Sequence, residues 1–204
     1  MLRISAPLVL QFVLSTVTWL AFFILLEQYG DRAKAISNAM RNVFGLMGIM
    51  IWAFASTTNT MVSNLIGQGA QHKVVKAVNK IMLLSLGATL CMLTVLNIFP
   101  THFLGLFRQN DLFVKEALPV VRVVSIGMIM MSIAAVWLNA VTGTGKTKMN
   151  LVIELAAIVF YLLYTLVMVN KLKLPLAIVW TNEIVYWLPV FFISYWFIRR
   201  GKYT

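Results

Sequence analysis

The sequence predicts an all-α integral membrane protein whose single domain, residues 1–204, is a lobe of six transmembrane helices. Of its 204 residues, 61% are hydrophobic and only 11% are charged. The apolar residues also gather in long stretches, and a helix needs about 20 mostly apolar residues to cross a bilayer. The stretches of suitable length are Ile4–Leu26, Ala39–Ile66, Ile81–Phe99, Leu118–Val141, Met149–Val169 and Leu176–Ile198.

These stretches favour helices over the strands of a membrane barrel. Barrel strands alternate polar and apolar residues, whereas 22–26 and 126–131 are apolar on both faces. Pro100 is expected to close the third helix, and Gly143 and Gly145 to end the fourth. With their polar flanks, the six predicted helices cover about 4–28, 35–66, 73–99, 112–142, 148–170 and 175–199.

The cations of the chain indicate a membrane surface rather than a nucleic acid. The net charge is +11, but the Lys and Arg residues flank the apolar stretches, where anionic headgroups account for them. The two sides receive nearly equal numbers of cations. Because Arg41 and Arg122 are expected inside helices, the loop cations favour cytoplasmic termini. We therefore expect a multi-pass protein of the inner (plasma) membrane with no nucleic-acid partner.

Polar residues expected at membrane depth recur at helical spacing, as Gln11, Ser15 and Thr18 do in the first helix. Such stripes either hold helices together or line an aqueous cavity, and charges and amides favour the cavity because lipid solvates them poorly. Trp52 and Trp187 lie on polar stripes, where their rings can contact an organic cation or fill space between helices. The candidates for a substrate cavity are Gln11, Ser15, Asn38, Arg41, Trp52, Asn139 and Trp187.

Three acidic residues are candidates for coupling transport to an ion. Glu154 and Glu183 are expected well inside helices, where a carboxyl group can exchange a proton or neutralise a cationic substrate. An internal ion pair with Arg41, Arg122 or Lys148 is the alternative. Glu27 is the third candidate, although Arg32 and Lys34 are close enough in sequence for a surface salt bridge.

The segment 140–147 fits a permissive phosphate-loop pattern, with Ala140 in place of the first glycine. That loop binds phosphate only between a strand and a helix. Here it follows a predicted transmembrane helix, and no strand that ends in a metal-binding Asp is predicted elsewhere. We therefore expect no enzyme, no cofactor and no metal site, beyond a coupling proton or sodium ion.

Two separated motifs resemble the multidrug and toxic compound extrusion (MATE) family. The segment 35–42, continuing through 52–56 to 60–69, resembles the second helix of the C-terminal half of such a transporter. The segment 139–148 resembles the connection between the tenth and eleventh helices, and Pro7 fits the seventh. The resemblance covers essentially the whole chain.

This resemblance implies one lobe of a twelve-helix transporter that exports drugs, other xenobiotics and organic cations by antiport against protons or sodium ions. A fragment of this kind would be inactive without an N-terminal lobe or a second chain. The best-known coupling carboxylate would fall at Ser15, and no acid lies between Glu116 and Glu154. A non-transporting membrane subunit or remnant, and a flippase of lipids or lipid-linked oligosaccharides, remain alternatives.

Overall fold

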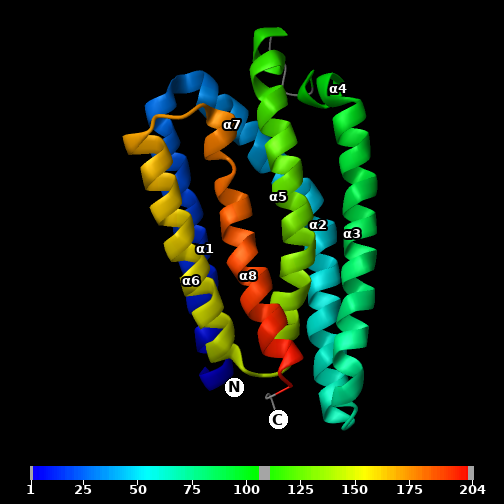
Figure 1. Cartoon of the computed structure of the whole chain (residues 1–204). Coiled ribbons are helices and arrows are strands. Elements are labelled where there is room, and N and C mark those ends of the chain that lie inside the picture. Colours follow the sequence, from blue (N-terminus) through cyan, green and yellow to red (C-terminus); the bar gives the residue numbers. More distant parts are fainter. Residues whose placement is uncertain (1, 106–110, 202–204) are drawn as a thin grey trace.

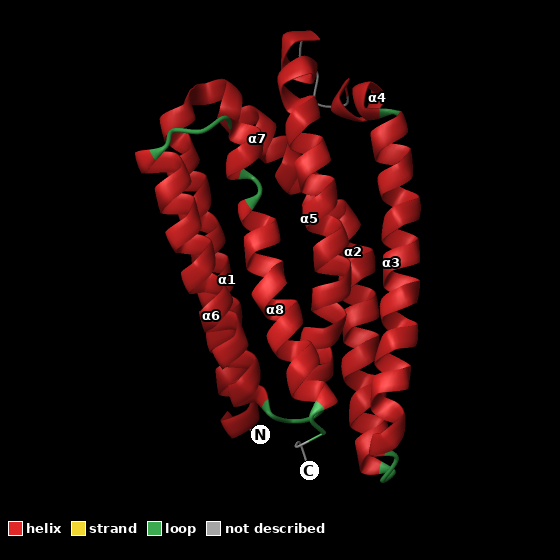
Figure 2. Ribbon diagram, viewed as in Figure 1, coloured by secondary structure: helices red, strands yellow, loops and turns green. Residues whose placement is uncertain are grey.

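The computed structural model describes residues 2–105 and 111–201, and all regular elements of these two segments are helices (Figures 1 and 2). Their lengths follow from the long apolar stretches, because a backbone in lipid must satisfy its hydrogen bonds within the helix. The long helices are α1 (Leu2–Leu26), α2 (Gly30–Gly67), α3 (Val74–Ile98), α5 (Asp111–Gly143), α6 (Thr147–Leu166) and α8 (Asn182–Arg199). The short ones are η1 (Glu27–Tyr29), η2 (Gln71–Lys73), α4 (Pro100–Gly105), η3 (Val167–Lys171) and α7 (Leu176–Val179).

Five helical runs of the described segments are long and apolar enough to cross a membrane. The first run, Ala6–Gly67, includes both α1 and α2, which Figure 1 shows as two antiparallel helices. Gly30, at φ 84° and ψ 177°, turns the chain between them. Glycine adopts such a φ without steric cost. The second long helix therefore begins at Gly30, five residues before its predicted start at 35.

The long helices form a bundle in which α1 begins and α8 ends at the same end (Figure 1). Helix α5 occupies the centre and packs against α2, α3 and α8. Helix α6 joins α1 to this core, because it packs against both α1 and α8. In contrast, α1 and α2 follow each other in the chain but contact each other only slightly. A gap therefore separates two consecutive helices.

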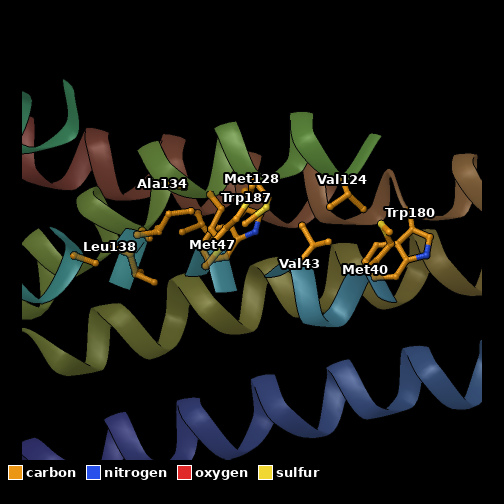
Figure 3. Close-up of a cluster of buried hydrophobic side chains, with 14 of the residues drawn as sticks. Met40, Val43, Met47, Val124, Met128, Ala134, Leu138, Trp180 and Trp187 are labelled. Carbon is orange, nitrogen blue, oxygen red and sulfur yellow. The ribbon is translucent and has the colours of Figure 1, made fainter. Parts of the chain in front are cut away.

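The core between α2, α5 and α8 consists of apolar side chains (Figure 3). Met40, Met47 and Met128 are buried there beside Trp180 and Trp187. Unbranched methionine side chains adapt their shape to the large indole rings. This dense core fixes α8 against α5, so the residues that α8 presents to the gap beside α1 are held in place.

The last helix is broken, which corrects the prediction of one continuous helix over 175–199. Helix α7 ends at Val179, and α8 begins at Asn182. Between them the backbone N–H of Thr181 bonds to the carbonyl of Ile178 at 3.1 Å, a tighter spacing than in an α-helix. The Thr181 hydroxyl bonds to the same carbonyl at 2.6 Å. The break places Glu183 in the first turn of a new helix.

Helices α2 and α5 approach each other closely at Gly143. A Cβ atom there would lie 2.7 Å from the carbonyl oxygen of Asn59 and 2.8 Å from Cβ of Val62. The Ser63 hydroxyl donates a hydrogen bond to the Gly143 carbonyl at 3.0 Å. Helix α5 ends at Gly143, and Gly145 has a φ of +77° in the connection to α6. The segment 140–147 therefore joins two helices, which is not the setting of a phosphate loop.

Candidate functional site

The gap between α1 and α2 holds a cavity of about 660 Å³, which α5, α6 and α8 also line. It forms because α1 packs mainly against α6 rather than α2. Most of the cavity wall is apolar and much of it is aromatic. The rings that line it are Phe12, Trp19, Phe44, Trp52, Tyr161, Tyr186 and Trp187. A cavity of this size and composition suits a drug-sized ligand.

The Glu154 carboxylate links three helices on one side of the cavity. Glu154, on α6, is only 2% exposed. Its Oε1 atom accepts hydrogen bonds from the Ser15 hydroxyl of α1, at 2.5 Å, and from the Tyr186 hydroxyl of α8. Its Oε2 atom accepts a bond from Nε2 of Gln11 at 3.3 Å. Ser15 is the position where the resemblance predicts a carboxylate, so the acid beside it comes from α6 instead.

Asn150 extends this cluster by one helical turn. It lies four residues before Glu154 on the same face of α6 and is 2% exposed. Its Nδ2 atom donates a hydrogen bond to Oε1 of Gln11 at 2.5 Å. Its own Oδ1 atom is buried and has no hydrogen-bond partner among the described residues. Cluster residues Gln11, Ser15, Glu154 and Tyr186 also line the cavity, and Asn150 joins them through its bond to Gln11.

Glu183 contributes a second carboxylate to the cavity from the first turn of α8. It is 6% exposed. The start of a helix favours a negative charge because its backbone N–H groups and dipole point toward it. Gly127 of α5 makes room for this side chain, since a Cβ atom at Gly127 would lie 3.1 Å from Cβ of Glu183. Trp187 lies one turn further along α8 and also lines the cavity.

Neither buried carboxylate forms an ion pair with a described cation. The ion pairs between described side chains are Arg32–Glu116, at 3.1 Å, and Lys34–Glu27, at 3.3 Å. Both pairs are substantially exposed. Arg41 is the one described cation that lines the main cavity, and its guanidinium lies over the Phe23 ring at 5.7 Å. The internal ion pair considered from the sequence is therefore absent for the described side chains.

The structure brings most of the predicted site residues together. Around the main cavity lie Gln11, Ser15, Arg41, Trp52, Trp187, Glu154 and Glu183. Asn38 instead lines a second cavity of about 350 Å³, together with Glu27 and Lys34. Glu27 is 61% exposed in its pair with Lys34. Asn139 lies outside both cavities and donates its amide N–H to the Ala135 carbonyl of its own helix at 3.0 Å.

Sequence reasoning missed several members of the site, among them Asn150, Tyr186 and Trp19. Asn150 carries a signal that was available, because it lies one turn before Glu154. Tyr186 and Trp19 look like ordinary apolar residues of a transmembrane helix, and only the tertiary structure places them on the cavity. The Tyr186 ring packs edge-to-face with the rings of Tyr161 and Trp187, with centroids 5.8 and 4.9 Å apart.

The MatE family model matches residues 7–167 of this chain. Among solved structures, a MOP superfamily transporter from Pyrococcus furiosus Vc1 is 15% identical, with a TM-score of 0.85 over 98% of this chain and 45% of its own. An outward-facing multidrug resistance MATE family transporter of the MOP superfamily is 16% identical, with a TM-score of 0.86 over 100% of this chain and 46% of its own. A MATE crystallised with MaD3S is 18% identical, with a TM-score of 0.85 over 100% of this chain and 46% of its own. This chain therefore spans less than half the length of these structural neighbours, and no curated protein matches it.

Proposed function

The chain belongs to the MatE family of membrane transporters, and on that premise we propose that it forms half of a cation-coupled antiporter that exports organic cations and other drug-like compounds. Its structure is all-helical and corresponds to one lobe, about half, of the transporter fold. The driving ion is a proton or a sodium ion. The partner half is an N-terminal lobe or a second chain, and the expected location is the plasma membrane with cytoplasmic termini.

The observation that carries this proposal is that two carboxylates line an aromatic cavity and that neither forms an ion pair with a described cation. Among the described residues, the cavity lining holds the carboxylates of Glu154 and Glu183 and one guanidinium, that of Arg41, so its side chains favour a positively charged ligand. An aromatic ring attracts an organic cation by about 0.5–2 kcal/mol, depending on how well water is excluded. Apolar walls with few polar anchors tolerate guests of different shape, as export of many compounds requires.

Coupling follows from competition for a carboxylate. If an inward-moving ion and an outward-moving organic cation both need the charge of Glu183, the binding of one opposes the binding of the other. Glu183 faces the cavity close to the rings of Trp19 and Trp187, whereas three donors already hold Glu154. We therefore assign substrate exchange to Glu183 and give Glu154 a role in holding α1.

A partner half is expected along the open side of the cavity. The large side chains of Phe12 on α1 and Trp52 on α2 line the cavity and are exposed. A flippase for anionic lipid headgroups would favour several cations in the cavity. Arg41 is the only cation that lines it in the described segments, and Arg122 is exposed elsewhere on α5. The cavity chemistry therefore supports export of cations over that alternative.

Equilibrium binding of radiolabelled tetraphenylphosphonium to the purified chain in nanodiscs tests this function. We expect saturable binding that Trp52→Ala weakens about 2- to 30-fold, the equivalent of one cation–π contact. Trp196→Ala is the matched control, because Trp196 is 51% exposed and Trp52 49%, but Trp196 lies against Arg200 and away from the cavity. No saturable binding, or equal weakening by both substitutions, would contradict the proposal.

A further inference from the structure

The second cavity, of about 350 Å³, lies where α1 ends and α2 begins, at the end of the lobe away from the two termini (Figure 1). It exists because these two helices contact each other only slightly. Leu20 and Ile24 of α1 contribute apolar, exposed side chains to its wall. Lys34, Asn38 and Arg41 contribute from α2, where spacings of four and three residues place them on one face. The cavity therefore combines an apolar wall with a row of side chains that carry N–H donors.

The charges of this row are only partly compensated. Nζ of Lys34 lies 3.3 Å from Oε1 of Glu27, which also lines the cavity. Arg41 forms no ion pair with a described acid, and its guanidinium lies over the Phe23 ring at 5.7 Å. Lys34 and Arg41 thus face the single carboxylate of Glu27, so the described lining carries one positive charge in excess. The cavity therefore suits a group with one negative charge.

The length of α2 places the row at the level of the lipid headgroups. The helix has 38 residues and is about 57 Å long at 1.5 Å per residue, whereas the hydrocarbon core of a bilayer is about 30 Å thick. A centred α2 extends about 13 Å beyond the core at each end. Lys34 then lies among the headgroups, and Arg41, about 16 Å along the helix from Gly30, lies just inside the core. A guanidinium at that depth needs an anionic partner, because water is scarce there.

We propose that this cavity binds the phosphate group of one anionic phospholipid, from the leaflet opposite the chain termini. The planar guanidinium of Arg41 matches the oxygens of a phosphate and forms charge-assisted hydrogen bonds with them. The Asn38 amide, about one turn earlier on the same face, adds a neutral donor. The acyl chains lie along Leu20 and Ile24, whose exposed side chains face lipid. A free phosphate ion would leave this apolar wall unused.

The bound lipid has a consequence for both parts of the lobe that it touches. It joins α1 to α2 at a place where the two helices scarcely pack against each other. Arg41 also lines the main cavity, where it is the one described cation. A phosphate on Arg41 neutralises that cation and leaves the two carboxylates to set the charge of the main cavity. The lipid site is separate from export itself, and its occupancy can be measured without transport.

Native mass spectrometry of the full chain in detergent micelles, titrated with single lipids, tests this site. We expect one phosphatidylglycerol to bind at least about 10-fold more tightly than phosphatidylcholine with the same acyl chains. Arg41→Gln should weaken phosphatidylglycerol binding at least about 10-fold, because it removes charge-assisted hydrogen bonds. Arg122→Gln is the matched control and should leave the affinity unchanged. Arg122 is likewise exposed on a long helix, but it lines neither cavity.

Glu27→Gln tests the sign of the charge and separates it from damage to the lobe. The substitution removes the exposed partner of Lys34, so it should tighten phosphatidylglycerol binding about 2-fold or more. Loss of structure would weaken binding instead. Glycerol phosphate, which has the phosphate without acyl chains, should not compete at the concentration of the lipid. The proposal is overturned by equal affinity for the two lipids, by equal weakening in Arg41→Gln and Arg122→Gln, by unchanged or weaker binding in Glu27→Gln, or by effective competition from glycerol phosphate.

Discussion

Replacing Gly143 with alanine should destabilise the lobe, because α2 and α5 leave no room for a methyl group there. The new Cβ atom would lie 2.7 Å from the Asn59 carbonyl oxygen and 2.8 Å from Cβ of Val62, whereas ordinary contact begins at 3.4 Å. The two helices would therefore have to separate by about 0.7 Å, and overpacking of this kind costs about 1–3 kcal/mol. The same movement lengthens the Ser63–Gly143 hydrogen bond, worth about 0.5–1.5 kcal/mol.

The higher helix propensity of alanine offsets at most about 1 kcal/mol of this loss. We expect a net decrease of about 1–3 kcal/mol in the free energy of unfolding, measured by titrating SDS into mixed micelles and following helix content. Gly87→Ala on α3 is the matched control. Apart from the backbone of its own helix, no heavy atom of the described residues would lie within 4 Å of the new Cβ, so stability should stay unchanged or rise slightly. Equal stability of the two variants would refute the close approach of α2 and α5.

The other predictions concern transport and access to the cavity. The chain alone, reconstituted into liposomes, should show no gradient-driven dye efflux, because a single lobe has no second lobe to move against; robust efflux from a verified monomer would overturn this. In the complete transporter, Glu183→Gln should reduce coupled efflux more than Glu27→Gln, since Glu183 faces the cavity and Glu27 is exposed beside Lys34. Equal losses at matched expression would contradict that ranking. In a Cys91→Ser background, cysteines at Gln11, Ser15 and Trp52 should react with a water-soluble thiol reagent faster than one at Asn139, which lies off the cavity; equal rates at all four positions would argue against a wet cavity.

The sequence alone indicated that this protein lies in a lipid bilayer and that it is built of helices. Apolar stretches of membrane-spanning length can satisfy their backbone hydrogen bonds only as helices or a closed barrel, and continuous apolar runs favour helices. The spacing of Gln11 and Ser15 also defined the polar face of the first helix. The acids Glu154 and Glu183 stood out because carboxylates are rare at membrane depth. These conclusions depend on residues close together in the chain.

The tertiary structure decided which polar faces meet. Ser15 and Glu154 are 139 positions apart. The helical period of the sequence does not indicate that α1 would pack against α6 and leave a cavity beside α2. Asn139 and Asn150 are equally plausible amides in the sequence. The amide of Asn139 bonds to its own helix, while that of Asn150 reaches across to Gln11. At the break before α8, the Thr181 hydroxyl bonds to the nearby Ile178 carbonyl and also lies 2.6 Å from the Tyr164 hydroxyl of α6, a contact that the sequence does not indicate. Periodicity fixes the face of a helix, whereas side-chain fit between helices distant in sequence selects the neighbour of that face.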